Sequence, residues 1–200
     1  MLGVAALVGL LLSPQGPVAT RPDSAPAPIS TATAVRAALP PVIDGRDTDP
    51  VWREAPPITG FKEWQPTEGA EPRHPTEARV AYDAGNLYVF VRAFDTHPDS
   101  IVRLLARRDN FPPSDRMGII VDSYHDRRTG FEFFVNASGV KFDAAMYDDG
   151  DEDEAWDGVW DVATRIDSLG WAAEFRIPLS QLRYGTQRQH TFGIAILRDI

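Results

Sequence analysis

Residues 170–182 read GWAAEFRIPLSQL. Glu174 and Arg176 alternate with apolar neighbours, and we expect these two charged side chains on the solvent face of a strand. Pro178 ends that strand because it cannot donate to a central ladder, and the residues after it fit one helical turn. The buried face is predicted from the apolar side chains at every second position, Trp171, Ala173, Phe175 and Ile177.

Seven further runs with strand character lie upstream and downstream of this stretch. Turn residues separate them, for example at 83–86 and 137–139. Helical periodicity is almost absent, although Asp49 and Pro50 suit the cap and first position of a short helix. We therefore predict an all-β fold, an antiparallel β-sandwich of the immunoglobulin or jelly-roll kind with one or two helical turns. The other predicted strands are residues 76–82, 87–94, 117–122, 131–136, 140–147, 160–166 and 191–197.

Bulk composition narrows the classes of function. The chain has 200 residues, which fits one domain and a tail, and 43% of them are hydrophobic, which is enough for a core. A net charge of -9 argues against a nucleic-acid partner, because phosphate binding needs a positive face. The sequence has no cysteine, which excludes disulfides, thiolate zinc sites and cysteine nucleophiles.

The first forty residues are expected to lie outside the folded domain. Residues 1–12 are apolar but too few to span a bilayer, which needs about 20. We interpret residues 1–19 as a signal peptide with a truncated basic region, cleaved after Ala19 or Ala27. Residues 20–40 are rich in Pro and Ala and are predicted to be a linker. The protein is thus expected to be exported to the periplasm, the outer membrane or the extracellular space.

The predicted domain, residues 41–200, resembles the family 9 carbohydrate-binding modules. Two stretches together carry this resemblance: VIDGRDTDPVW at 42–52 and GWAAEFRIPLSQL at 170–182. Further motifs are similar to a bacterial subgroup in which the module precedes a predicted outer-membrane β-barrel domain. The remaining matching segments are residues 76–83, 86–89, 107–109, 124–130 and 135–140.

The resemblance implies a β-sandwich that binds sugar, with calcium in some members. Characterised xylanase-linked members hold the end of a glucan or xylan chain between two tryptophans. The expected partner is accordingly a glucan-like or xylan-like poly- or oligosaccharide, in the setting of polysaccharide catabolism beside glycoside hydrolases. A C-terminal domain after Ile200, such as a β-barrel, is expected in the same protein.

Aromatic side chains are the first candidates for a sugar site, because their faces stack on the C–H surface of a pyranose. Trp52, Trp160 and Trp171 follow buried patterns and are predicted to lie in the core. The carbohydrate-binding candidates lie in segments without such a pattern. They are Trp156, in an acidic loop, Trp64, in the coil before Pro66, and with weaker support Tyr124 and Tyr147.

An acidic loop is the candidate metal site. Residues 148–154 hold six carboxylates among seven residues, and calcium takes oxygen ligands from loops of this kind. The alternative is a solvated acidic loop, because charge blocks are usually solvated. Candidate structural calcium ligands are Asp148, Asp149, Asp151 and Asp153 in the loop, with Asp122 and Asp95 at strand ends.

The sequence shows no constellation typical of an enzyme. G-x-S-x-G, HExxH and P-loop motifs are missing, and the four histidines are isolated. We predict a non-catalytic module, which would act beside a hydrolase of glycosidic bonds. Two alternatives stay open: a docking domain that packs on a C-terminal barrel without sugar binding, and a haem-binding sandwich. Candidate haem ligands are Met117, Met146, Lys62 and Lys141.

Five arginines are a further group of candidate binding residues. They are candidates for recognising carboxylates of acidic sugars or for docking a partner domain, since guanidinium groups bind carboxylates in a bidentate manner. These are Arg103, Arg107, Arg108, Arg127 and Arg128.

Overall fold

The computed structural model describes residues 31–110, 112–148, 150–186 and 190–200. The predicted signal peptide, the first half of the predicted linker and Asp149 lie outside these residues. Ala32–Ile200 forms one compact unit, so its start precedes the predicted boundary at residue 41. Among the described residues, no helix is long and apolar enough to cross a membrane.

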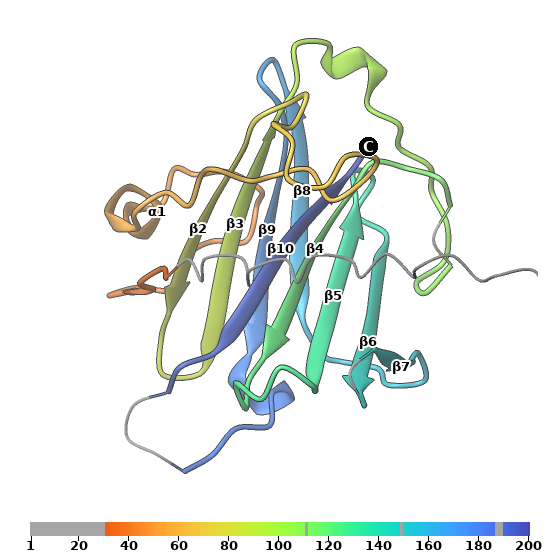
Figure 1. The fold of residues 1–200 in the computed structure, drawn as a ribbon. Helices are drawn as coiled ribbons and strands as arrows, with labels where there is room; N and C mark the ends of the chain where they lie inside the picture. The colour runs from red at the N-terminus through yellow and green to blue at the C-terminus, as the bar shows by residue number, and fades with distance from the viewer. Residues whose placement is uncertain (1–30, 111, 149, 187–189) are drawn as a thin grey trace, which may run out of the picture. The chain divides into compact units, whose positions relative to one another are not determined.

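Two five-stranded sheets make up this unit (Figure 1). The first sheet has the order β1-β2-β3-β9-β8 and the second sheet has the order β10-β4-β5-β6-β7. All neighbouring strands are antiparallel except β1 and β2. The strands of the first sheet are β1 Val35–Arg36, β2 Thr76–Tyr82, β3 Asn86–Phe94, β9 Gly170–Pro178 and β8 Asp161–Asp167. Those of the second are β10 Gly193–Asp199, β4 Arg116–Asp122, β5 Gly130–Asn136, β6 Lys141–Tyr147 and β7 Asp151–Asp153.

The predicted β-sandwich is confirmed, and each of the eight predicted strands has its counterpart. Two further strands, β1 and β7, were not predicted. β1 lies within the Pro- and Ala-rich segment, and β7 consists of Asp, Glu and Asp, which have low strand propensity. Both are short strands at a sheet edge, and their neighbours rather than their own sequences determine them.

The main core lies between the two sheets. Alternate side chains of the strands point inward and are almost fully buried, as the period of two predicts. Trp160 and Trp171 belong to this core, with 2% and 0% of their surface exposed. Large members of the core from both sheets include Val89, Phe175, Ile177, Met117, Ile119 and Phe133.

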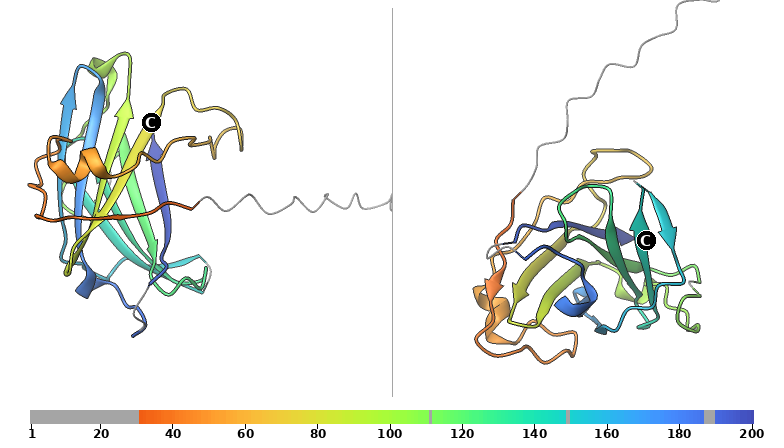
Figure 2. Two further views of the ribbon diagram at one scale, coloured as in Figure 1. Left: turned by 90° about the vertical axis from the view of Figure 1, so that its left-hand side faces the viewer. Right: turned by 90° about the horizontal axis from the view of Figure 1, so that it is seen from below.

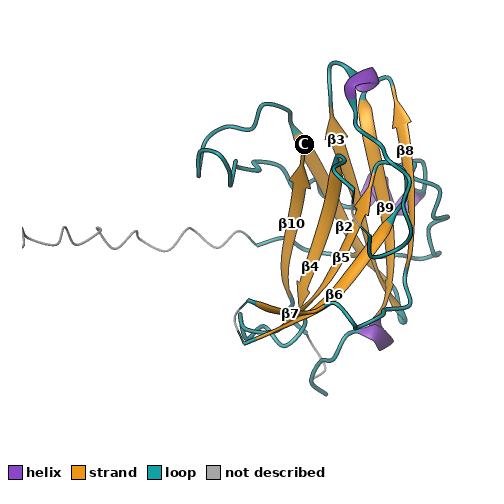
Figure 3. Ribbon diagram, turned by 90° about the vertical axis from the view of Figure 1, so that its right-hand side faces the viewer, coloured by secondary structure: helices purple, strands orange, loops and turns teal. Residues whose placement is uncertain are grey.

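A second, smaller cluster covers the outer face of the first sheet. Helix α1, Pro50–Glu54, packs on this outer face (Figure 2). Its buried residues are Val51 and Trp52, so all three predicted core tryptophans lie in the interior. Two 3-10 turns, Pro98–Ser100 and Leu179–Gln181, are the other helical segments among the described residues, and they lie outside the two layers of strands (Figure 3).

One sequence prediction is wrong at this face. Glu174 was expected in solvent, but it is 0% exposed because the segment before α1 covers it. Its carboxylate accepts hydrogen bonds from Trp52 Nε1 at 2.8 Å and from the backbone N–H groups of Asp44 and Gly45 at 2.9 Å. The two stretches that predicted the fold therefore meet through this carboxylate.

The sandwich has two ends, which we name after the termini of β4. At the Arg116 end, β4 starts beside Asp199 of β10 and Asn136 of β5. At the Asp122 end, β4 finishes beside Gly193, and β5 starts. The loops at these two ends are separated by the length of a seven-residue strand, about 20 Å.

Candidate functional site

Three of the four predicted sugar-binding residues meet at the Asp122 end. They line a cavity of about 520 Å³, a size common for small-molecule sites. The β4–β5 turn, the β6–β7 hairpin, the segment after β7 and the segment after the second 3-10 turn contribute its walls. The lining residues are Tyr124, Asp126, Thr129, Gly130, Phe131, Ala145, Met146, Tyr147, Asp153, Trp156 and Arg183.

Trp156 is seated deeper than an open loop would place it. Its ring centroid lies 5.0 Å from that of Phe131 and 5.8 Å from that of Phe133, in tilted and edge-on arrangements. The side chain is half-buried and packs against the main core. Part of the indole surface is thus committed to the core, and part lines the cavity.

The two tyrosines supply more accessible surface. Tyr124 is 54% exposed and Tyr147 is 45% exposed. Tyr147 ends β6, and Tyr124 follows β4, so the ladder of the second sheet fixes both backbones near one another. Within the described chain, neither hydroxyl has a hydrogen-bond partner, so both are available to donate or accept.

The charged groups at the cavity differ in how many hydrogen bonds and ion pairs they already make within the protein. Asp126 accepts hydrogen bonds from the backbone N–H groups of Arg128 and Thr129, both at 2.8 Å. These bonds lower the pKa of Asp126, which stays ionised as the cap of its turn. Asp153 accepts one bond, from the N–H of Ala155 at 3.1 Å. The exposed guanidinium of Arg183 makes no ion pair with the described residues.

Trp64 lies away from this cavity. It is 76% exposed in the coil that leads to β2. That coil ends at the Arg116 end, where Arg198 Nη1 donates to the carbonyl of Pro75 at 3.0 Å. The structure therefore does not bring Trp64 and Trp156 together, and the two indoles cannot hold one sugar ring between them.

The predicted calcium ligands are distributed over both ends. Asp148, Asp151 and Asp153 lie on the exposed β6–β7 hairpin, and Asp149 lies outside the described residues. Asp122 accepts the N–H of Arg127 at 2.7 Å as a turn cap. Asp95 is buried beyond the end of β3, where it accepts the N–H of His97 at 2.7 Å.

Asp95 and Asp122 therefore belong to opposite ends of the sandwich and cannot bind the same ion. The described residues contain no group of three or more acidic or histidine side chains arranged to hold a metal. The calcium site stays a prediction.

The candidate haem ligands have other contacts. Met117 is fully buried in the main core, and Lys62 pairs with Glu71. Lys141 Nζ donates to the carbonyl of Trp160 at 2.7 Å and lies 4.7 Å from the centre of its ring. Met146 lines the cavity at the Asp122 end.

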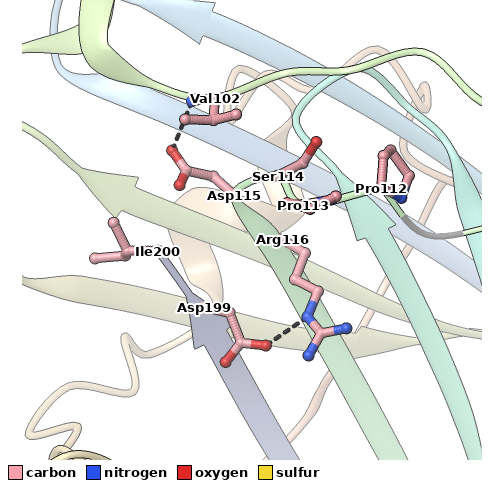
Figure 4. Close-up of a pocket in the computed structure, with 8 residues that line it drawn as sticks. All are labelled: Val102, Pro112, Pro113, Ser114, Asp115, Arg116, Asp199 and Ile200. Atoms are coloured by element: carbon pink, nitrogen blue, oxygen red, sulfur yellow. Dashed lines mark hydrogen bonds and ion pairs between the residues drawn. The ribbon is translucent and has the colours of Figure 1, made fainter.

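A second hollow, of about 470 Å³, lies at the Arg116 end (Figure 4). Pro112 and Pro113 form part of its wall, and Arg116 pairs with Asp199 across its floor. The N–H of Val102 donates to Asp115 Oδ2 at 3.2 Å beside it. None of the predicted site residues lines this hollow, and no aromatic residue is among its described lining residues.

Several residues that line the cavity at the Asp122 end were not predicted from the sequence. Phe131 has the pattern of a core strand residue, and Arg183 follows the last apolar residue of a turn, so neither carries a local signal of function. Arg183 reaches this end because β9, in the opposite sheet, and the 3-10 turn after it end there.

Comparisons with known proteins agree with the β-sandwich fold. The family model described as carbohydrate family 9 binding domain-like matches residues 43–198. A family 9 carbohydrate-binding module from Caldicellulosiruptor kristjanssonii in complex with glucose has a TM-score of 0.56 at 18% identity, covering 83% of this chain and 76% of that chain. The same kind of module from that organism in complex with cellotriose has a TM-score of 0.54 at 18% identity, with coverages of 83% and 75%.

A third solved structure, a protein from Bacteroides uniformis ATCC 8492, has a TM-score of 0.60 at 15% identity. The likeness covers 84% of this chain and 81% of that chain. The chain matches none of the curated proteins. At these identities the solved structures establish the fold, and the family match covers most of the chain.

Proposed function

The chain belongs to the carbohydrate family 9 binding domain-like family, and from this premise we propose that it binds an oligosaccharide in the cavity at the Asp122 end. One observation carries the proposal: Trp156, Tyr124 and Tyr147, from three separate segments, line one cavity. Aromatic faces on a half-open surface are the chemistry that the C–H face of a pyranose requires.

Polar groups around the rings complete the expected recognition. The two free tyrosine hydroxyls and Arg183 can donate to sugar oxygens, and Asp153 has lone pairs left to accept from hydroxyl groups. Burying such groups without partners would cost free energy, so a ligand rich in hydroxyls suits this cavity better than an apolar one.

Two solved structures with the same fold support a ligand class for this proposal. Modules of Caldicellulosiruptor kristjanssonii were solved with glucose and with cellotriose. These ligands support a β-glucan-type oligosaccharide as the first candidate here, with xylan-type chains as the related class. Cellotriose is therefore the probe of choice.

We extend the proposal to the setting of the domain. Residues 1–19 act as an export signal, and the module serves, without catalysis of its own, in an envelope or polysaccharide-degrading protein that includes a further domain such as a barrel or a hydrolase. Calcium is proposed as a structural ion of the acidic hairpin. The apolar start of the chain and the carboxylates of residues 148–154 support these two points.

Calorimetric titration with cellotriose tests the sugar site. Trp156→Ala is expected to weaken binding at least about tenfold, because stacking and burial of one indole are worth more than about 1.4 kcal/mol. Tyr147→Ala, at an exposed position, is expected to weaken binding by a smaller factor without affecting folding.

Trp64→Ala is the matched control, since it removes an exposed indole at the opposite end. We expect it to bind cellotriose as the unmodified chain does. Binding that is lost on removing Trp64 and kept on removing Trp156 would place the site elsewhere. If no heat of binding is measured with any cello- or xylo-oligosaccharide, the proposal of sugar binding is rejected.

A docking domain without sugar binding is the second candidate, and one surface favours it. The outer face of the second sheet carries half-buried apolar side chains at Ile120, Phe134 and Leu197. Beside them Glu132 is only 6% exposed. A partner domain would bury this face, and in that case the oligosaccharide titrations would be silent.

A further inference from the structure

A buried carboxylate lies beside the segment that follows Trp156. Asp143 of β6 is 1% exposed and faces the segment that joins Trp156 to Trp160. Its Oδ2 accepts the backbone N–H of Gly158 at 2.5 Å. Its Oδ1 accepts from Nε of Arg108 at 3.2 Å and also from Nη2 of the same guanidinium.

Arg108 holds the other side of the same peptide segment. Its Nη2 donates to the carbonyl of Gly158 at 2.8 Å. The Asp143–Arg108 pair thus binds both the N–H and the C=O of one residue, which fixes the position and the orientation of that backbone. Bonds to charged partners are stronger than neutral ones, and a buried ionised carboxylate needs such partners.

Gly158 in turn touches the indole of Trp156. A methyl group added at Gly158 would lie 2.7 Å from Cη2 of Trp156 and 3.3 Å from Oδ2 of Asp143. No carbon atom can sit that close to the ring, so the indole packs directly on the bare backbone. Where Gly158 lies therefore determines where the indole can lie.

We propose that Asp143, held by Arg108, is a positioning residue that sets the indole of Trp156 as a wall of the sugar cavity. The inference deepens the proposed function and rests on it, because it assigns the cause of the indole's placement. The ion pair comes from the loop before β4 and from β6, so it couples a remote segment of the chain to the cavity.

Asp143→Asn is the variant that separates charge from size. The asparagine keeps one oxygen but presents an amide donor, which must face either the guanidinium of Arg108 or the N–H of Gly158. One of the two contacts is lost in each orientation. Arg108→Lys removes the fork that reaches both Asp143 and Gly158 while keeping the charge.

Three measurements are made on each variant of the full chain: cellotriose affinity by calorimetry, thermal unfolding, and indole emission. Emission is compared with and without Trp156→Phe, so that the contribution of Trp156 is obtained by difference. We expect Asp143→Asn to weaken cellotriose binding about tenfold and to shift the emission of Trp156 to longer wavelength. Gly158→Ala, which displaces the ring directly, is expected to do the same.

Asp161→Asn is the matched control, because it breaks an exposed pair with Arg176 that does not contact Gly158. It should leave both affinity and emission unchanged. A folded Asp143→Asn chain with unchanged affinity overturns the proposal, as does weaker binding with unchanged emission of Trp156. If Asp143→Asn fails to fold, Arg108→Lys and Gly158→Ala decide by the same two readouts.

The failure of the proposed function would look different. An unmodified chain that binds no cellotriose or xylo-oligosaccharide rejects the sugar site, and with it the role of Asp143 toward sugar. The emission shift in Asp143→Asn would then report only the contact between the carboxylate, Gly158 and the indole.

Discussion

Glu132 is a buried carboxyl group for which the described residues supply no hydrogen bond. It lies between Ile120 of β4 and Ala144 of β6 on the outer face of the second sheet. Burial raises its pKa to about 7, the nearby charge of Glu152 acts in the same direction, and Arg116 opposes them. The folded chain therefore holds this proton more tightly than the unfolded chain, in which the pKa is near 4.5.

Glu132→Gln is predicted to change the pH dependence of stability. Because the folded pKa is raised, the contribution of Glu132 is fully present below pH 4.5 and is lost as the pH rises through about 7. The loss amounts to at most about 3 kcal/mol. Glutamine does not titrate, so the variant should melt higher than the unmodified chain at pH 8, with little difference at pH 4.5.

Thermal unfolding across that pH range measures the effect. Glu68→Gln, at an exposed position, serves as the control and should give the same difference from the unmodified chain at every pH. A Glu132→Gln chain with a pH-independent difference would show that Glu132 does not titrate in this window.

Glu174 shows where sequence reasoning at the level of single residues stops. The alternation of β9 correctly placed its side chain on the face opposite Phe175. The same alternation cannot say what covers that face, because the cover comes from residues more than a hundred positions earlier. The prediction of solvent exposure failed for this reason, whereas Trp52, Trp160 and Trp171 were correctly predicted as core.

At the scale of elements, β1 contributes to the domain although its composition resembles that of a linker. Val35 and Arg36 pair with Ala81 and Tyr82 of β2, and the N–H of Ala37 donates to the carbonyl of Tyr82 at 2.7 Å. Ala37 is buried in the second cluster with Trp52. Strand pairing of this kind depends on backbone groups, which leave no trace in the side-chain pattern.

A chain that starts at Pro41 is therefore predicted to be less stable than one that starts at Ala32. The shorter chain loses the pairing of β1 and exposes part of the second cluster. We expect its free energy of unfolding to fall by about 1–3 kcal/mol, as measured by urea denaturation at pH 7. Equal urea midpoints for the two chains would mean that β1 adds nothing to stability.

The sequence predicted only part of the candidate site, because local patterns identify aromatic residues near turns but not which turns lie together. Tyr124, Tyr147 and Trp156 stand out as aromatic residues beside turns, and turns at one end of a sandwich come together. Trp64 has the same local signal but belongs to the opposite end. Which turns share an end depends on strand order, and local residue patterns do not reveal that order.

At the scale of the whole molecule, the two ends differ in chemistry. The Asp122 end combines aromatic rings with the acidic β6–β7 hairpin, and Asp153 of that hairpin lines the cavity. With a net charge of -9, the chain repels itself, and the hairpin concentrates that repulsion beside the proposed sugar site. A cation bound there would relieve the repulsion and rigidify one wall of the cavity.

Calcium is accordingly predicted to raise the melting temperature of the chain and to tighten cellotriose binding, because an ion that binds only the folded state stabilises it by mass action. The exposed carboxylates of Asp148, Asp151 and Asp153 indicate weak, millimolar affinity. Differential scanning calorimetry with calcium, against sodium chloride of equal ionic strength, separates binding from screening. Asp151→Asn with Asp153→Asn should abolish the calcium-specific part, and equal melting temperatures in the two salts would reject the site.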